Sequence, residues 1–207
     1  MNKTAKRIVS TLLFGRLVWS GPKDGGLYLT FDDGPHGENT EEILRTLKKE
    51  QCVASFFLSG DAAFKHQSIV RDIYAAGHLI ANHGTTHQRR GNHNTISFLK
   101  DAFRCQMLLE RITGDSALKK IFRPPYGELK IIDAMILIAF GYRVIMWSVD
   151  SEDSFISQDE NLLAKIDEMT LKGGDILLFH EDSAMTTRLL PKILSLLKRN
   201  NYAFSSF

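Results

Sequence analysis

The chain has 207 residues, of which 43% are hydrophobic, and its 26 Lys and Arg residues nearly balance 24 Asp and Glu residues. A chain of this size and composition can bury a sizeable core as one globular α/β domain. Because the charges balance, nothing supports a nucleic-acid-binding protein held by a basic field, and no nucleic acid is expected as a partner. Cys52 and Cys105 lie among apolar residues and outside any CxxC pair, so they are predicted to be buried free thiols.

Residues 1–25 are predicted to form an N-terminal leader ahead of a catalytic domain at 26–207. Three basic residues precede an apolar run from Ile8 to Gly15, as in a signal peptide, but Arg16 interrupts this run and no small-x-small cleavage site follows. We therefore expect a retained amphipathic leader whose residues 1–20 contact a membrane surface. The protein is accordingly expected to be cytoplasmic and membrane-peripheral, since no stretch approaches the roughly 18 apolar residues of a transmembrane helix.

From Leu27 onward, short β-prone runs alternate with segments of helical spacing. The predicted strands cover residues 27–31, 52–58, 78–82, 121–125, 142–149, 175–179 and 202–207. The predicted helices cover residues 40–50, 68–77, 96–114, 131–141, 161–174 and 188–201. This alternation favours a single α/β domain with a mostly parallel sheet, and the periodicity leaves open whether the sheet rolls into a barrel or stays open with helices on both faces.

Reactive polar residues stand at or directly after the ends of five predicted strands. They are Asp32 with Asp33, His83, Arg123, Asp150 and His180. In parallel α/β folds the C-terminal ends of the strands share one face, and ligands bind at that face. Residues that are far apart in the sequence are therefore expected to converge there.

The stretch NHGTTHQ places His83 and His87 four residues apart. In a helical turn both imidazoles would project from one side and could hold one metal ion, although histidines also fall four apart by chance. Asp32 or Asp33 can supply a third ligand, but neighbours on a strand point to opposite faces, so only one is expected to bind the ion. The alternative to a ligand role is that DDGP, residues 32–35, is only a strand that ends in a turn. Two histidines and one carboxylate leave a coordination position for water, as in catalytic sites.

The segments RPPYG and LLFHED offer further catalytic groups. Arg123 could hold the second carboxylate and keep it ionised, or it could form an ordinary surface salt bridge. The two prolines that follow have no amide hydrogen, so Tyr126 carries the first free backbone donor, which could face a developing oxyanion. His180 is either a core histidine bonded to a carbonyl or a general acid for a leaving amine, and in the second case a carboxylate such as Asp150 would orient it and raise its pKa.

Five short motifs, TFDDGP, HGTTH, RPPYG, WSVDSED and ILLFH, occur in the order and at spacings compatible with the polysaccharide deacetylases of carbohydrate esterase family 4. The chain resembles this family, which includes the chitooligosaccharide deacetylase of nodulation-factor synthesis, from about Gly26 to Tyr202. The resemblance implies a distorted (β/α)-barrel with seven strands, in agreement with the seven predicted runs. It also implies removal of acetyl groups from N-acetylated sugars of an oligosaccharide, a polysaccharide or a glycolipid.

Carried over residue by residue, the resemblance assigns a role to each polar position. Asp32 would be the general base, positioned by Arg123, and His180 would be the general acid, tuned by Asp150. The family pattern further implies metal ligation by Asp33, His83 and His87, oxyanion stabilisation by the main-chain NH of Tyr126, and a wall for the acetyl methyl group formed by Leu178. One divalent ion is expected, and Zn²⁺ suits the ligand set best, with Ni²⁺, Co²⁺ and Mn²⁺ as alternatives.

The chain departs from the family pattern at two places. Gly84 stands where the family usually has Ser or Thr after the first histidine, so a supporting hydrogen bond is either lost or moved to Thr85. After Asp153 the family often has Trp, whereas this chain has Ser154 and Phe155. The second departure concerns the shape of the substrate groove and leaves the proposed reactive residues in place.

Three other functions compete with an N-deacetylase. A carbohydrate-binding relative without turnover would usually lack a base, a ligand or an acid, and all three are present here. An esterase acting on O-acetyl sugars would use the same residues. A two-metal phosphoesterase would need bridging ligands beyond Asp33, His83 and His87.

Overall fold

The computed structural model describes residue 13 and residues 15–207. Residues 1–12 and 14, which carry most of the predicted leader and of its expected membrane contact, lie outside the described residues. Leu17 and Val18, near the end of that leader, form a strand (β1) that pairs with the sheet of the domain. Within the described part of the chain, none of the helices is long and apolar enough to cross a membrane.

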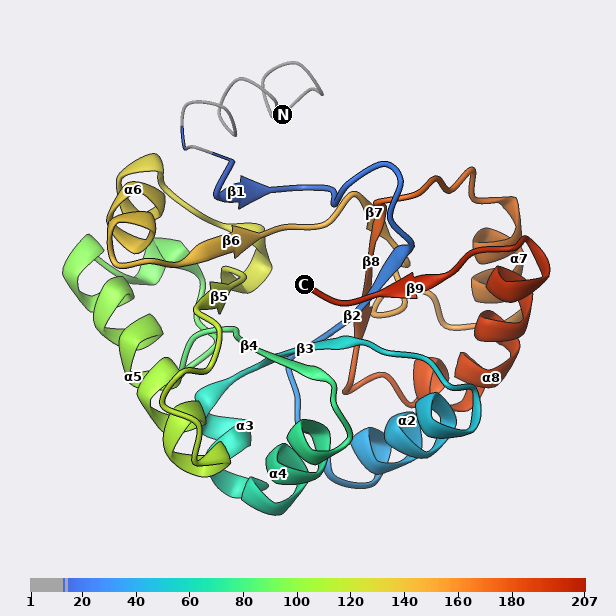
Figure 1. The fold of residues 1–207 in the computed structure, drawn as a ribbon, viewed down its shortest axis with the longest axis horizontal. Coiled ribbons are helices and arrows are strands. Elements are labelled where there is room, and N and C mark those ends of the chain that lie inside the picture. Colours follow the sequence, from blue (N-terminus) through green and yellow to red (C-terminus); the bar gives the residue numbers. More distant parts are fainter. Residues whose placement is uncertain (1–12, 14) are drawn as a thin grey trace.

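The sheet is parallel throughout and curves into a distorted barrel (Figure 1). Along the sheet the strand order is β1, β6, β5, β4, β3, β2, β8 and β7, and β9 pairs with β2. The predicted barrel is therefore confirmed, with nine strands among the described residues in place of seven. The remaining strands are β2 (Leu27–Asp32), β3 (Ser55–Leu58), β4 (Leu79–Asn82), β5 (Ile121–Phe122), β6 (Arg143–Ile145), β7 (Val149–Asp150), β8 (Ile176–His180) and β9 (Phe204–Ser205).

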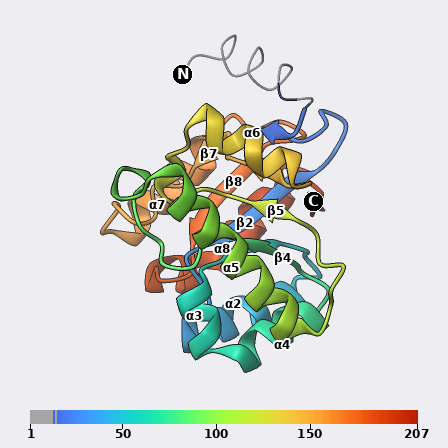
Figure 2. The same ribbon diagram turned by 90° about the vertical axis from the view of Figure 1, so that its left-hand side faces the viewer.

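Helices surround the strands on the outside of the barrel (Figures 1 and 2). All six predicted helices are present, and the short α3 was not predicted because six residues are too few for a clear helical period. The helices are α2 (Gly37–Lys49), α3 (Gly60–Lys65), α4 (Gln67–Ala75), α5 (Thr95–Thr113), α6 (Ile131–Ala139), α7 (Asp159–Glu168) and α8 (Ala184–Arg199), with 3₁₀ turns η1 (Arg90–Asn92) and η2 (Pro125–Gly127).

Side-chain hydrogen bonds cap the starts of α5 and α8, and a glycine ends α5. The side chain of Asn94 caps the start of α5 by accepting a hydrogen bond from the main-chain NH of Ser97 at 2.9 Å. The same helix ends at Gly114, whose φ of 74° is the left-handed conformation that glycine adopts without strain. Ser183 caps α8 in the same way, with Thr186 as the donor at 3.1 Å.

Strand β2 is buried on both faces, so its sequence is a continuous run and not an alternation of apolar and polar residues. Leu29 and Phe31 face the helices and belong to the largest core cluster. Tyr28 points into the barrel, where its ring stacks on that of Phe207 with 4.4 Å between centroids. Thr30 also points inward, and its hydroxyl donates to the carbonyl of Leu177. This rigid strand ends at Asp32, on the face where the other strands also end.

Candidate active site

Side chains from the C-terminal ends of β2, β4, β5, β7 and β8 meet at one end of the barrel, as the alternation of strands and helices predicted. The chain forms a cleft of about 860 Å³ there. Eight of the nine predicted site residues line the cleft, and the ninth, Arg123, is buried beneath it. The eight are Asp32, Asp33, His83, His87, Tyr126, Asp150, Leu178 and His180.

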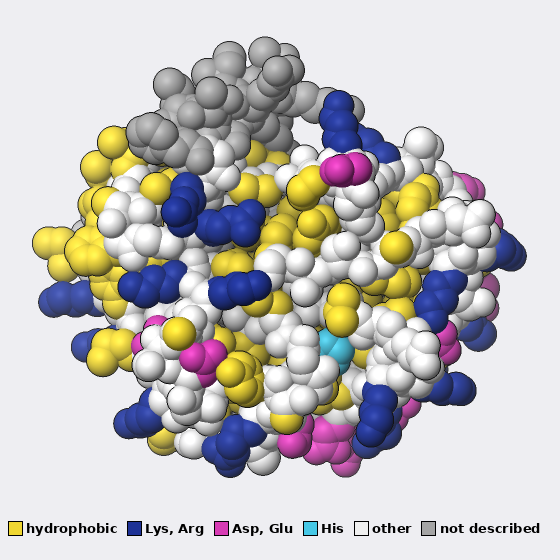
Figure 3. Space-filling model, viewed as in Figure 1, with side chains coloured by type: hydrophobic (Ala, Val, Ile, Leu, Met, Phe, Trp, Pro, Cys, Tyr) yellow, Lys and Arg dark blue, Asp and Glu magenta, His cyan; other side chains and the backbone are white. Residues whose placement is uncertain are grey.

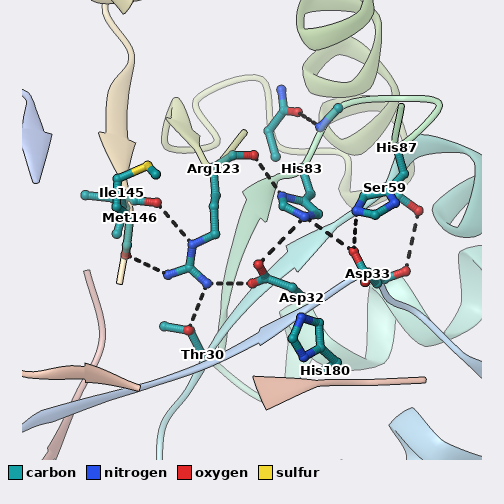
Figure 4. A network of polar contacts seen from close by, with 12 residues as sticks. Thr30, Asp32, Asp33, Ser59, His83, His87, Arg123, Ile145, Met146 and His180 are labelled. Atoms are coloured by element: carbon teal, nitrogen blue, oxygen red, sulfur yellow. Dashed lines mark hydrogen bonds and ion pairs between the residues drawn. The ribbon is translucent and has the colours of Figure 1, made fainter. Parts of the chain in front are cut away.

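Asp33, His83 and His87 form a compact cluster (Figure 4). Oδ1 of Asp33 lies 2.8 Å from Nε2 of His87 and 3.3 Å from Nε2 of His83. Burial raises the pKa of Asp33, but hydrogen bonds and charges from the two histidines lower it by more, so its carboxyl is held ionised. One candidate ligand atom from each residue lies within 4.8 Å of the other two, a separation that suits binding to a common ion.

The hydrogen bonding of His83 provides a test of whether a cation fits this cluster. Nδ1 of His83 is 2.8 Å from the carbonyl oxygen of Arg123, and because a carbonyl only accepts, Nδ1 carries the hydrogen. In the neutral ring Nε2 then presents a lone pair to the carboxylate of Asp33. Two electron-rich atoms facing each other need a proton or a metal ion between them. The proton gives the His83–Asp33 ion pair, and a metal ion can take its place, because a carbonyl commonly orients a metal-binding histidine in this way. The residues therefore fit a divalent ion.

The two histidines are not on a helical turn, and that expectation is wrong. Strand β4 ends at Asn82, and the segment that follows is a loop in which His87 has a φ of 49°. Asp101 of α5 holds this loop: its carboxylate accepts from the main-chain NH of Thr85 at 2.7 Å, and its main-chain carbonyl accepts from the hydroxyl of Thr85. A tertiary contact, and not a helical repeat, brings the imidazoles together.

Asp101 also explains the glycine at position 84. A Cβ at Gly84 would lie only 2.8 Å from Oδ2 of Asp101, and residues with a Cβ rarely adopt a φ of 78°. The hydroxyl of Thr85 donates to the main-chain carbonyl of Asp101 at 2.7 Å, which agrees with the second of the two alternatives raised by the sequence.

Arg123 is fully buried beneath the cleft, so the surface salt bridge considered for it is ruled out. Its Nη1 donates to Oδ1 of Asp32 at 2.5 Å and to the hydroxyl of Thr30 at 2.9 Å. Its other two nitrogens donate to the main-chain carbonyls of Ile145 and Met146 (Figure 4). Because every donor group has a fixed partner, the guanidinium holds Asp32 in one orientation. Oδ2 of the same carboxylate faces the cluster of Asp33, His83 and His87 and lies 3.7 Å from Nε2 of His83.

The two adjacent aspartates both reach the cleft because the strand ends at the first of them, so their side chains need not point to opposite faces. Asp32 is the last residue of β2, whereas Asp33 has a φ of 71° and lies outside the strand. The left-handed conformation turns the Asp33 carboxylate toward the histidines, and the Asp32 carboxylate stays with Arg123. The expectation that only one of them would join the ligand cluster is confirmed, and the cluster takes Asp33.

The carboxylate that orients His180 is Asp153, and the prediction that Asp150 does so is wrong. Oδ1 of Asp153 lies 2.7 Å from Nδ1 of His180, and its Oδ2 accepts from the main-chain NH of His180 at 2.9 Å and from the Thr186 hydroxyl at 2.6 Å. Burial lowers the pKa of His180, but Asp153 raises it by more, with smaller contributions from the other aspartates, to about 9. The sequence motif contained both aspartates, and their spacing alone does not identify the partner.

The turn after β7 decides between the two aspartates. Strand β7 ends at Asp150, whose Oδ1 accepts from the main-chain NH of Glu152 at 2.9 Å. Glu152 has a φ of 59°, so the chain reverses there and brings Asp153 back beside β8. Asp150 remains in the wall of the cleft, and the hydroxyl of Ser154 lies 3.0 Å from Nδ1 of His180.

Tyr126 and Leu178 lie in the cleft wall where the motifs placed them. Tyr126 has a φ of 58° in the turn η2, and its ring centroid is 4.8 Å from that of His87. The guanidinium of Arg89 covers the tyrosine ring at 4.3 Å. Leu178 is buried in β8, where it pairs with Thr30 on one side and Asp150 on the other.

Glu181, which directly follows His180, is a buried group that the sequence reasoning did not single out. It is fully inaccessible to solvent, and burial raises its pKa well above the usual range. Its carboxyl accepts from the hydroxyl of Thr40 and fills the space beside Gly34, where any Cβ would overlap it. Its main-chain NH donates to the carbonyl of Asp32 at 3.0 Å. The signal in the sequence was a carboxylate placed directly after a strongly apolar strand.

Known proteins are similar to this chain in sequence and in fold. A family model described as polysaccharide deacetylase matches residues 20–145. A peptidoglycan-N-acetylglucosamine deacetylase of Bacillus cereus is 30% identical over 189 residues, which cover 87% of this chain and 68% of that protein. A chitooligosaccharide deacetylase of Azorhizobium caulinodans is 33% identical over 158 residues, which cover 75% of this chain and 73% of that protein. The solved structure of a family 4 carbohydrate esterase from Streptomyces lividans, in complex with acetate, aligns with a TM-score of 0.80 and 28% identity over 89% of this chain and 94% of that chain.

Proposed function

Because the chain belongs to the polysaccharide deacetylase family, we propose that it is a metal-dependent hydrolase that removes acetyl groups from N-acetylated sugars. The observation that carries this proposal is the arrangement of three units around one cleft. The Asp32–Arg123 pair and the His180–Asp153 pair both border the Asp33, His83 and His87 cluster. The proposed base, the proposed acid and the candidate metal ligands thus lie together at one cleft.

The metal site is proposed to use Asp33, His83 and His87 as ligands. A divalent ion bound there supplies Lewis acidity, which activates water near neutral pH and polarises a carbonyl. Two imidazoles and one carboxylate are a ligand set that zinc favours, and nickel, cobalt and manganese also accept it. We propose Zn²⁺ as the ion.

Asp32 is proposed to act as the general base. Oδ1 of Asp32 accepts a hydrogen bond from Arg123. Oδ2, which faces His83, is therefore free to take a proton from an attacking water. The rigid hydrogen bonding of Arg123 keeps this carboxylate aimed at the cleft. The main-chain NH of Tyr126 is proposed to stabilise the negative charge that develops on the amide oxygen, and Leu178 to contact the acetyl methyl group.

His180 is proposed to donate a proton to the departing amine nitrogen. Its pKa of about 9 keeps the ring protonated at neutral pH, as a general acid requires. Asp153 orients the ring through Nδ1, which leaves Nε2 as the nitrogen that can donate into the cleft. The products are acetate and a free amino sugar.

Acetate release is the direct test. Protein loaded with Zn²⁺ should release acetate from N-acetylglucosamine oligomers, and a chelator should abolish release until Zn²⁺ is restored. Asp32→Asn should keep the metal and lower kcat by roughly 10²- to 10⁴-fold, the usual contribution of a general base. Acetate release by Asp32→Asn at the parental rate would disprove the assigned mechanism. A matching panel of O-acetylated sugars separates an amidase from an esterase.

A further inference from the structure

A second cavity of about 410 Å³ lies next to the catalytic cleft, beside η2 and the start of α6. Tyr126, Gly127 and Trp147 line both spaces, so the two share a wall. The remaining residues that line the second cavity are Leu17, Trp19, Leu129, Lys130, Ile131, Ala134 and Met146. The two spaces therefore adjoin at this wall.

The chemistry of the second cavity differs from that of the cleft. Carboxylates, imidazoles and basic groups line the catalytic cleft, as a polar sugar requires. Among the described residues that line the second cavity, Lys130 is the only charged one. Seven of the others have aliphatic, thioether or indole side chains, and of these seven only Trp147 also lines the cleft. This lining offers few polar side-chain groups to the hydroxyl groups of a further sugar unit and presents mainly apolar surface, which suits a hydrocarbon group.

Apolar surface continues outward from this cavity along α6. Ile131, which lines the cavity, is 63% exposed, and Ile132 and Met135 on the same helix are 49% and 51% exposed. Hydrophobic side chains gather at the edge of the molecule that contains α6 (Figure 3). The charged residue of this helix, Asp133, is buried in an ion pair with Arg90, so it does not interrupt the exposed apolar surface. Exposed apolar surface of this kind is typical of interaction sites, among them ligand-binding grooves.

We propose that the second cavity binds an apolar aglycone, so that the substrate is an amphiphilic acetylated sugar of the glycolipid class. This inference rests on the proposed deacetylase function and narrows its substrate. The acetylated sugar occupies the catalytic cleft, and the hydrocarbon attached to it passes the shared wall at Tyr126 and Trp147 and lies in the second cavity. The occupant is the substrate itself because the two spaces adjoin.

Alkyl N-acetylglucosaminides of increasing chain length test the proposal. With the full-length, Zn²⁺-loaded protein, kcat/KM for acetate release should rise from the methyl to the octyl glycoside by up to about fourfold for each buried methylene group. Concentrations are kept below those at which the glycosides form micelles. Ile131→Glu should flatten this dependence on chain length. Ile96→Glu is the matched control, because Ile96 is 67% exposed at the start of α5 and is not among the described residues that line either space, and it should keep the dependence.

Tryptophan fluorescence gives a second readout that does not require turnover. The chain has two tryptophans, Trp19 and Trp147, and both line the second cavity. An octyl glycoside brominated at the end of its chain should quench their emission, and Ile131→Glu should weaken the quenching whereas Ile96→Glu should not. Because Ile131 is exposed, its replacement should not prevent folding.

The possible results separate this inference from the proposed function. Equal kcat/KM for methyl and octyl glycosides, with acetate released from both, would overturn the aglycone site and leave the deacetylase intact. No acetate from any glycoside would contradict the proposed function, and the quenching experiment would still decide whether the cavity binds hydrocarbon. Equal quenching of the wild-type protein and Ile131→Glu would also overturn the aglycone site.

Discussion

Oδ1 of Asp153 lies 2.7 Å from Nδ1 of His180, and the other oxygen of the same carboxylate accepts a hydrogen bond from the main chain of His180. One side chain thus fixes both the ring and the backbone of the proposed general acid. The hydroxyl of Thr186 in turn fixes the carboxylate. This relationship determines the protonation state of His180, and its removal has consequences that can be measured.

Asp153→Asn should lower the pKa of His180 from about 9 toward its usual value of 6.5. A general acid must be protonated, so the alkaline limb of the pH dependence of kcat should shift to lower pH by a similar amount. Asp150→Asn is the control, since Asp150 bonds to Glu152 and not to His180. Measurement of kcat from pH 5 to 10 for the three proteins tests this, and an alkaline limb that moves in Asp150→Asn but not in Asp153→Asn would contradict it.

The same pair should make folding stability depend on pH. The pKa of His180 is raised in the folded protein, so its contribution is fully present below pH 6.5 and is lost as the pH rises through about 9. Denaturant unfolding of metal-free protein at intervals between pH 6 and 10 should show this decline, and Asp153→Asn should reduce it. A wild-type slope retained in Asp153→Asn would assign the decline to another group.

Arg123→Ala should destabilise the protein by about 3–5 kcal/mol, because it leaves the carboxylate of Asp32 buried without its cation. Arg45→Ala removes an arginine paired with Glu41 and Glu42 at the exposed surface, and should change stability by less than about 1 kcal/mol. The midpoints and slopes of urea unfolding measure both effects. Similar losses in the two variants would mean that burial of the Asp32–Arg123 pair has no special cost.

Metal binding should depend on His87 and not on His36. Zn²⁺ at 100 times its dissociation constant should stabilise the folded protein by about 2.7 kcal/mol, provided that the unfolded chain does not bind it. His87→Ala removes one member of the ligand cluster and should abolish most of this stabilisation. His36→Ala changes a histidine that lines the cleft outside the cluster and should retain it. Thermal unfolding with and without Zn²⁺ gives the comparison. If Zn²⁺ stabilised His87→Ala as much as the wild-type protein, His87 would be excluded as a ligand.

The Glu181→Gln variant should fold, and its free energy of unfolding relative to the wild-type protein should increase as the pH rises. Burial raises the pKa of Glu181, so above pH 4.5 the folded protein retains a proton that the unfolded chain releases, and the free energy of unfolding falls. Glutamine has nearly the same shape and does not titrate. The difference in unfolding free energy between variant and wild type should therefore increasingly favour the variant from pH 5 to 8 in metal-free protein. Glu42→Gln, at an exposed position, should not change the slope.

The architecture and most of the site could be predicted because they follow from short-range patterns. Alternating strands and helices make the strands parallel, and the C-terminal ends of parallel strands lie on one face. This alone brought Asp32, His83 and His180 together from three distant segments. Side chains at the strand ends or directly after them were therefore placed correctly at the cleft.

The predictions failed or remained open where the chain leaves a strand. Asp150 and Asp153 are three residues apart, and the positive φ of Glu152 decided which one meets His180. His83 and His87 are brought together by the contact of their loop with Asp101, and no helical repeat is involved. In each case a few backbone angles in a turn redirect a side chain, and local sequence does not specify these angles.

The sequence by itself determined a single α/β domain, a mostly parallel sheet and the set of reactive side chains at one rim, because β and α periods are local properties of the chain. The barrel was implied only by the family resemblance, and the periods left it open. Only the tertiary structure decided that Arg123 is buried against Asp32, that Glu181 fills the space beside Gly34, and that an apolar cavity adjoins the cleft. These features depend on how segments far apart in the sequence pack against each other, and such packing is fixed by the shape of the whole core.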